Sequence, residues 1–519
     1  MQWNISDYRR EITVTAEAPD PITIESKAAR LAIKIKRLAH TIRWRAYWLL
    51  PNALPVPYRQ DKSHRIQRDR ESNEQSRVPV DEELRIQVIW GAELYGPSEA
   101  DALYEGLERL KWAAGSDAEG ANGWVKHQRT YGRGSAWYNV GLAAERKDRS
   151  RFIMLENFAS LPDNVDYIIV RLYQLTPSLT CIVIGFVLKE STSYCYEEEL
   201  RRDRSSIKER HWRGWAVSTI EPDHLKQRSI DNIRTKLRGI TMRWFRQNLP
   251  GYFSGLADDR MPTAELITSK SQQLMPCITE ARQGYGWWSQ VIEFSPLDVW
   301  TSADCPELRF STLRKRGDQG SLHILATLRT ASIPDDKLKM FGGHGRSAYA
   351  SYCNEILDGL LSNYAAISYL QEVSKDIKSS RSELRMSEMK RANGMRVLQR
   401  VQSFFDRSLS TPAVARELRD LSSNLSHHLH TCPKFTSPQW PDTLKKFEIA
   451  KTLCKHTNYL ATQVISDEHS TREHFDQLSN ILNIRESIRA QRRVEWISIA
   501  AFLVAAGSLL IALFPTHQG

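Results

Sequence analysis

The C-terminal end contains the feature that most limits how this 519-residue chain can be organised. Residues 496–514 read WISIAAFLVAAGSLLIALF and include no charged side chain. A helix of that length rises about 28 Å, which is close to the roughly 30 Å hydrocarbon core of a bilayer. Trp496 suits one membrane interface, and Pro515 ends the helix after Phe514. The segment therefore predicts one transmembrane helix over 496–514.

The residues on either side of this segment predict its orientation. Only PTHQG follows it, whereas four arginines precede it: Arg485, Arg489, Arg492 and Arg493. Positive charge collects on the cytoplasmic side of membrane helices. We therefore expect a tail-anchored, single-pass protein with a cytoplasmic N-terminus, in a prokaryotic inner membrane because sorting signals are missing. A buried core helix is the alternative, but the segment is apolar on all sides.

Small residues recur along the same segment at Ala501, Ala505, Ser508 and Ala512. A stripe of small side chains lets two membrane helices approach closely, so it predicts self-association into a homo-oligomer. The alternative is that such residues are simply common in helices of this kind.

The composition of the whole chain indicates a globular, basic protein. The hydrophobic fraction is 41%, the charged fraction is 26%, and the mean hydropathy of −0.47 excludes a multi-spanning transporter. The seven cysteines form no CxxC pair, which indicates reduced thiols. The net charge of +11 is concentrated in residues 27–77 and 201–246. Each block holds 13 Lys/Arg, against 4 and 5 Asp/Glu respectively.

The first basic block contains an amphipathic pattern over residues 27–48. Its apolar side chains recur at helical spacing, with cations between them: Leu31, Ile35, Leu38 and Ile42. One interpretation is a helix that lies on an anionic lipid surface. The other, which we favour from sequence alone, is a helix that packs on a domain and keeps a solvated basic face.

Segment patterns divide the chain into four parts. Residues 1–80 form a basic region with this helix and a linker, and residues 81–340 alternate strands and helices as an α+β domain with mainly antiparallel pairing. Within that domain, 165–188 predicts a hairpin, with a second membrane span as the rival. Residues 345–495 predict a helical bundle or stalk that continues into the membrane segment at 496–514.

Two short motifs are candidates for chemistry. The Gly-rich turn around Gly343, His344 and Arg346 precedes a helix and could bind phosphate, although a linker is the simpler interpretation. His427, His430 and Cys432 could hold a metal ion, but their spacing matches no known zinc module. Histidines at the end of a helix also complement its dipole.

No catalytic or cofactor-binding pattern is found, so we expect no cofactor and favour a protein that is not an enzyme. The sequence predicts a membrane-tethered sensor, effector or scaffold. The alternatives are an oligomeric membrane-perturbing effector and a nucleic-acid- or nucleotide-binding protein held at the membrane. Trp and Arg alternate in HWRGW (211–215) and MRWFR (242–246), a composition that also suits nucleic acid. We favour an anionic lipid surface as the partner of the basic blocks.

Overall fold

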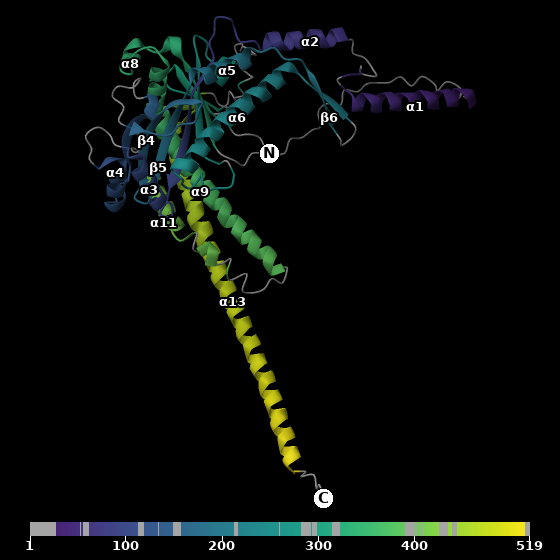
Figure 1. Ribbon diagram of the computed structural model, residues 1–519, viewed down its shortest axis with the longest axis vertical. Coiled ribbons are helices and arrows are strands. Elements are labelled where there is room, and N and C mark those ends of the chain that lie inside the picture. The colour runs from purple at the N-terminus through teal and green to yellow at the C-terminus, as the bar shows by residue number, and fades with distance from the viewer. Residues whose placement is uncertain are drawn as a thin grey trace. The chain divides into compact units, whose positions relative to one another are not determined.

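The computed structural model describes most of the chain between Lys27 and Leu513 (Figure 1). The described residues are 27–51, 53–54, 62–112, 119–132, 134–148, 157–211, 216–258, 260–281, 292, 298–313, 322–389, 399, 402–405, 408–424, 434–438 and 444–513. They belong to two compact units. Residues 1–72 with 204–222 make the smaller unit, and residues 73–203 with 223–519 make the larger unit.

The larger unit is built on one sheet, which has eleven strands among the described residues. The strands are β1 (Arg85–Tyr95), β2 (Ala136–Ala144), β3 (Asn157–Phe158), β4 (Val165–Thr176), β5 (Leu179–Leu188), β8 (Thr263–Ser269), β9 (Val299–Thr301), β10 (Leu308–Leu313), β11 (His323–Arg329), β12 (Thr436–Pro438) and β13 (Lys446–Glu448). Their order is β13-β12-β9-β10-β11-β8-β1-β5-β4-β2-β3. Neighbours pair antiparallel, except that β11 with β8 and β2 with β3 are parallel.

The central hairpin of this sheet follows directly from the sequence. β4 and β5 are long apolar strands joined by a two-residue turn, and Val170 pairs with Ile184 in their antiparallel register. Almost every residue of both strands is buried, which is the pattern of a sheet covered on both faces. The hairpin predicted over 165–188 is therefore confirmed.

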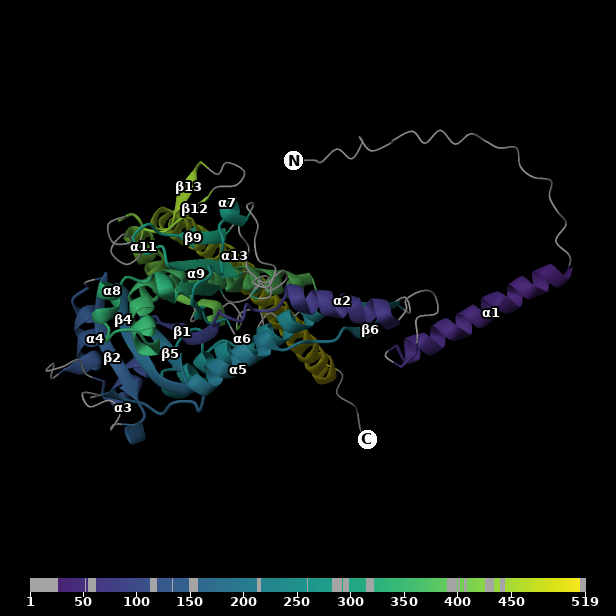
Figure 2. The same cartoon turned by 90° about the horizontal axis from the view of Figure 1, so that it is seen from above.

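Helices cover both faces of the sheet. Those of the larger unit are α3 (Ala100–Leu110), α4 (Gly120–Thr130), α5 (Glu190–Arg201), α6 (Pro222–Asn248), α7 (Ile278–Ala281), α8 (Asp335–Lys339), α9 (Arg346–Met389), α11 (Thr411–Ser422) and α13 (Ile449–Leu513). On one face, the Phe186 ring lies 5.7 Å from the Trp244 ring of α6. On the other, the Trp90 indole N–H donates to Asn354 Oδ1 of α9 at 2.8 Å. The strands therefore lie between α6 and α9 (Figure 2).

The helices of the C-terminal part do not form a separate bundle. The apolar stripe of α9 packs on β1, β4, β5 and β8, and α13 packs against α9 and α11. Residues 436–438 and 446–448, which lie inside the predicted bundle, add β12 and β13 to the sheet. The predicted fold class, an α+β domain followed by a helical stalk and a transmembrane helix, is therefore wrong. The larger unit is a mixed α/β fold, because the stripe that was expected to face other helices faces the sheet.

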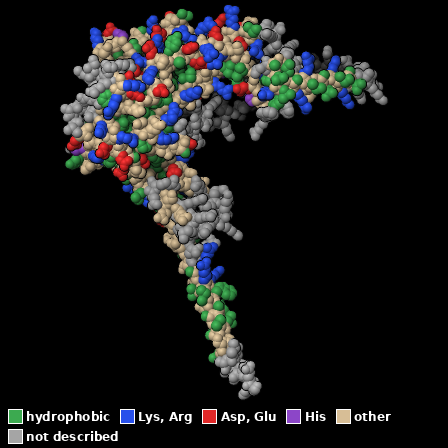
Figure 3. Space-filling model, in the orientation of Figure 1, with side chains coloured by type: hydrophobic (Ala, Val, Ile, Leu, Met, Phe, Trp, Pro, Cys, Tyr) green, Lys and Arg blue, Asp and Glu red, His purple; other side chains and the backbone are tan. Residues whose placement is uncertain are grey.

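The predicted transmembrane helix is the second correction. Figure 3 shows apolar side chains gathered at the C-terminal end of α13, and those described from Trp496 to Leu509 are mostly exposed. Among the described residues, no helix combines the length and the apolarity that crossing a bilayer requires.

The predicted membrane topology and localisation depended on this helix and are corrected with it. The prediction of a tail-anchored, single-pass protein in a prokaryotic inner membrane, with its N-terminus in the cytoplasm, is wrong by this finding. Phe514 and the residues after it lie outside the described part of the chain.

The smaller unit contains α1 (Lys27–Leu49), residues 62–72 of α2 (Lys62–Gln75), and the hairpin of β6 (Ile207–His211) and β7 (Ala216–Ile220). In that hairpin, Arg210 pairs with Val217 in an antiparallel register. This unit therefore combines a segment near the N-terminus with one from the middle of the chain.

Candidate functional site

The smaller unit brings together parts of the two basic blocks. Residues 27–72 hold 12 Lys/Arg and 3 Asp/Glu, and residues 204–222 hold 4 and 2. The Ser206 backbone N–H donates to Asp69 Oδ2 at 3.1 Å across 137 positions of sequence. The Arg68 guanidinium lies 4.0 Å from the Glu221 carboxylate. These contacts join α2 to the hairpin and concentrate positive charge in one unit.

An apolar stripe runs along α1 and is exposed. Leu31, Ile35, Leu38 and Ile42 recur at steps of four, three and four, so they share one narrow sector of the helix. Their side chains are between 58% and 63% exposed. A stripe that packed on a domain would be buried, so this exposure fits the surface-binding interpretation better than the packing interpretation.

Cations border this stripe. Five described basic side chains of α1 are exposed: Lys34, Lys36, Arg37, Arg43 and Arg45. The helix contains no Asp or Glu. Figure 3 shows basic and apolar side chains close together along α1. Because long basic side chains can lay their stems on an apolar surface while the charge stays in a polar layer, the two kinds of side chain can act together.

The C-terminal end of α1 is fixed to β6 (Figure 1). Tyr47 and Trp48 are buried in the smaller unit. Lys208 Nζ lies 4.8 Å from the centre of the Tyr47 ring, and the Arg210 guanidinium carbon lies 5.8 Å from the centre of the Trp48 ring. Arg210 also donates to the Leu49 carbonyl at 3.0 Å. Cation–π contacts and one hydrogen bond therefore attach the helix to the hairpin.

The electrostatics around Tyr47 show that cations lie close together. Partial burial lowers the pKa of Lys208, and the nearby Arg65 guanidinium lowers it further. Burial raises the pKa of the Tyr47 hydroxyl, and Arg65 opposes that rise. Arg65 of α2 thus acts electrostatically on both Lys208 and Tyr47.

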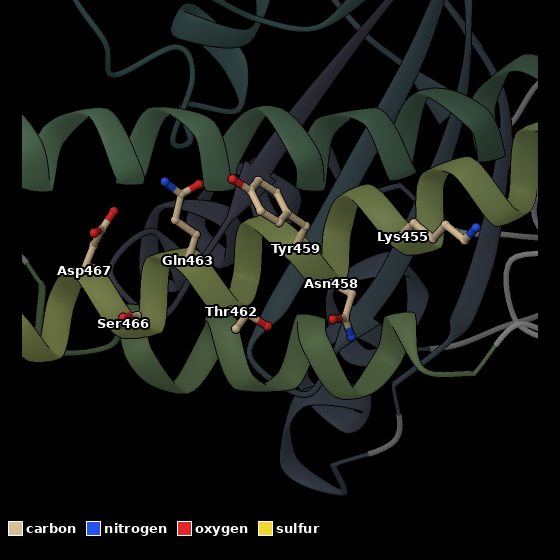
Figure 4. Close-up of a pocket in the computed structure, with 7 residues that line it drawn as sticks. All are labelled: Lys455, Asn458, Tyr459, Thr462, Gln463, Ser466 and Asp467. Atoms are coloured by element: carbon tan, nitrogen blue, oxygen red, sulfur yellow. The ribbon is translucent and has the colours of Figure 1, made fainter.

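A second candidate is a groove on α13 (Figure 4). The groove encloses about 500 Å³ and is lined by one side of that helix: Lys455, Asn458, Tyr459, Thr462, Gln463, Ser466 and Asp467. Asp467 lies 3.6 Å from Lys378 of α9. The lining mixes single charges of both signs with amides and hydroxyls, so it selects no particular class of ligand.

A third candidate is the buried ionic cluster around Glu265 of β8. Its carboxylate pairs with Arg234 of α6 and lies 3.2 Å from His323 Nε2 of β11. Burial alone would raise the pKa of Glu265, but Arg234 and His323 outweigh it and hold that pKa well below its usual range. Burial lowers the pKa of His323 to about 4. Because all three side chains are enclosed, the cluster attaches α6 to the sheet and cannot reach a substrate.

The residues predicted to bind phosphate lie in a well-bonded turn before α9. Arg346 donates to the Leu188 carbonyl at 2.8 Å and to Asp166 Oδ2 at 2.9 Å. His344 Nε2 lies 2.9 Å from Asp335 Oδ1. Gly343 has a φ of +95° and its N–H donates to the Leu338 carbonyl. The Arg346 guanidinium is thus engaged by a carboxylate of the sheet, and phosphate binding there stays a prediction.

The remaining predicted residues are only partly described. His427, His430 and Cys432 lie outside the described residues, and among those that are described no group of three or more His, Cys, Asp or Glu could hold a metal ion.

Trp496, Ala501 and Ala505 are exposed, and the Ser508 hydroxyl donates to the Val504 carbonyl. Arg489, Arg492 and Arg493 are exposed on α13. The side chains of Arg485, Ala512 and Phe514 are outside the described set.

The sequence did not identify Lys208 and Arg210 as partners of Tyr47 and Trp48. Both basic blocks were visible, but no local pattern shows that they meet. Their contact depends on packing between segments far apart in the chain, which periodicity does not report.

No known protein family, curated protein or solved structure matches this chain.

Proposed function

We propose that the protein is a non-catalytic peripheral scaffold or effector whose α1 helix binds an anionic lipid surface. The observation that carries the proposal is the exposed stripe Leu31–Ile35–Leu38–Ile42 with cations on its borders. A helix with this pattern lies in the interface plane, with its apolar face among the upper acyl chains. Binding of this kind needs no membrane-spanning helix.

Two contributions of similar size would favour this mode of binding. If half of each apolar side chain leaves water, four such residues contribute about 3 to 6 kcal/mol. Each Lys or Arg near an anionic surface contributes about 1 kcal/mol, and α1 has five described cations. Because α1 has no acidic residue, no charge of its own opposes the attraction. The combination is selective for membranes that are both fluid and negatively charged.

Nucleic acid explains less of the same surface. Phosphate backbones would satisfy the cations of α1 but would leave its Leu and Ile side chains in water. The four apolar side chains repeat over three turns of helix, so they are a continuous surface rather than scattered exposed residues. A lipid surface offers both an acyl-chain layer for the apolar stripe of α1 and an anionic headgroup layer for its cations.

Vesicle binding by the full-length protein tests the proposal. The vesicles would contain phosphatidylcholine with or without about 30 mol% phosphatidylserine, and binding would be measured by sedimentation. The variant Lys34→Gln with Lys36→Gln removes two cations and is expected to bind the anionic vesicles about 30-fold more weakly. Ile35→Ser with Ile42→Ser is expected to lose at least tenfold.

A matched control is available on α13. Ile481 and Ile484 are each 60% exposed, close to the 58% and 59% of Ile35 and Ile42. The control variant Ile481→Ser with Ile484→Ser should leave vesicle binding unchanged. Equal losses in both variants would contradict the proposal. The proposal would be overturned in favour of nucleic acid if single-stranded RNA bound tightly and displaced the vesicles. The RNA would also have to bind the Ile35→Ser, Ile42→Ser variant as well as it binds the wild type.

A further inference from the structure

The C-terminal end of α13 carries a dense exposed apolar surface. Every side chain from residue 487 to residue 505 is exposed. The large apolar side chains between residues 494 and 509 are each at least 50% exposed where they are described: Val494, Trp496, Ile497, Ile499, Phe502, Leu503, Val504 and Leu509. A continuous apolar surface of this kind indicates that another molecule covers it.

The area of this surface matches what a second copy of the chain would bury. A large apolar side chain removes on the order of 100 Å² from water when it is enclosed, so the set offers roughly 800 Å². That is about the area that each partner contributes to a protein interface of standard size. A second copy offers an identical surface on a helix of the same length.

The spacing of four residues defines a seam along this end of α13. Trp496, Ile499, Leu503 and Ala506 recur at steps of three, four and three, the spacing of the core positions of a coiled coil. In an antiparallel pair centred on residue 501, Ile499 is level with Leu503 of the second copy. Trp496 is then level with Ala506 of that copy, so a large side chain packs on a small one. A parallel pair would instead place two tryptophans against each other.

Charge also favours the antiparallel arrangement. Arg492 and Arg493 are exposed immediately before the apolar surface (Figure 3). In a parallel pair the arginines of the two copies would lie side by side and repel each other. In the antiparallel pair, Arg492 of one copy lies about 27 Å along the axis from Arg492 of the other, beyond the screening length of roughly 8 Å. Each Arg492 instead lies beside the last turn of the other α13, which ends at Leu513 and carries a partial negative charge.

We propose that the protein self-associates by antiparallel pairing of the α13 ends of two copies, with residues 489–513 overlapping. The opposite side of the helix carries the small side chains of Ala501, Ala505 and Ser508. Two such pairs can therefore stack through that side as a four-helix bundle. The proposal does not depend on lipid binding by α1, because it uses a different helix.

The mass of the full-length protein in solution tests the pairing. Light scattering at about 10 µM should give twice the 59.7 kDa of one chain, or four times that mass if the pairs stack. Ile499→Gln with Leu503→Gln should raise the dissociation constant at least about 100-fold and give the mass of one chain. Ile481→Gln with Ile484→Gln is the matched control, because both residues are exposed on α13 outside the overlap; it should leave the mass unchanged.

Cross-linking tests the orientation. Trp496→Cys protein mixed with Ala506→Cys protein should, after mild oxidation, yield a disulfide between positions 496 and 506, identified by peptide mass spectrometry. Links that join only 496 to 496 would contradict the antiparallel pair.

A wild type with the mass of one or three chains would overturn self-association of this kind. If that single chain also lost vesicle binding in the Ile499→Gln, Leu503→Gln variant, lipid would cover the α13 end instead. The outcome is independent of the α1 proposal, because Ile35→Ser with Ile42→Ser should weaken vesicle binding and leave the mass unchanged.

Discussion

At the scale of single residues, two buried carboxylates show how surroundings decide charge. Glu93 accepts backbone N–H groups from Phe253 at 2.7 Å, Ser254 at 2.8 Å and Leu94 at 3.0 Å. No cation is among the groups that shift its pKa, so burial prevails and raises the pKa of Glu93 to about 7. Glu265 is equally buried, yet Arg234 and His323 keep it ionised. The two carboxylates differ in pKa because Glu265 has ionic partners and Glu93 has none among the groups that shift its pKa, not because they differ in burial.

The raised pKa of Glu93 gives a pH prediction. Because the folded-state pKa lies above the unfolded value of 4.5, the folded protein binds more protons between about pH 4.5 and 7. The contribution of Glu93 to stability is therefore greatest at low pH and is lost as the pH rises through 7. Glu93→Gln cannot titrate, so over this range its free energy of unfolding should improve relative to wild type, by up to about 3 kcal/mol.

Urea unfolding of both proteins across this pH range measures that difference. Other titrating groups, including His323, act in both proteins and cancel in the comparison. A difference that is constant with pH would show that folding does not change the pKa of Glu93.

At the scale of elements, the attachment of α9 to the sheet depends on one close contact. Gly185 of β5 pairs with Trp90 of β1, and a Cβ added at Gly185 would lie 2.7 Å from the Trp90 indole nitrogen. That nitrogen donates to Asn354, whose amide group donates in turn to Asp358 at 3.1 Å. Asp358 pairs with Arg171 of β4 at 2.8 Å. The missing side chain at 185 thus allows a polar network to join α9 to two strands, β1 and β4.

Gly185→Ala should therefore be destabilising, because the methyl group forces the indole away from Asn354. The expected loss is about 1 to 3 kcal/mol in the free energy of unfolding. Gly345→Ala is the control, since a Cβ at that position has no atom within 4 Å; it should change stability by roughly 0.5 kcal/mol or less. Equal effects in the two variants, measured by urea denaturation, would show that the contact is not tight.

At the scale of the whole molecule, the larger unit is assembled from distant segments. β12 joins β9, although Thr436 and Thr301 are separated by 135 positions of sequence. β8 and β11 pair in parallel, and α9 packs on strands from the first half of the unit. Since the same sheet supports both halves, neither half has a core of its own, and the unit should unfold as one.

Core truncations in the two halves test this cooperativity. Leu357 of α9 and Ile184 of β5 are fully buried, so Leu357→Ala and Ile184→Ala should each cost about 2 to 5 kcal/mol. Calorimetry should show both variants lowering the midpoint of the same transition. Leu409→Ala should have little effect, because Leu409 is 75% exposed. A transition that Leu357→Ala shifts while Ile184→Ala does not would instead indicate an independent helical domain.

Local patterns predicted several elements of this fold correctly. The apolar runs on both sides of Thr176 and Pro177 predicted the β4–β5 hairpin, and the helical spacing from Leu31 to Ile42 predicted α1. The helical region predicted over 345–495 includes α9, but the predicted partner of that helix was wrong, because a stripe of Leu and Ile packs equally well on a helix or a sheet. The short strands β12 and β13 had no local signal, since three residues are too few for a period.

The sequence by itself determined the helical and strand periodicity of the long elements and the concentration of positive charge in two blocks, because these are properties of neighbouring residues. Only the tertiary structure decided that α9 packs on the sheet and that Lys208 and Arg210 lie over the aromatic rings at the end of α1. Burial, pairing and charge clustering depend on which distant surfaces meet. The exposed stripe of α1 became a candidate site in the same way, once its surroundings were known.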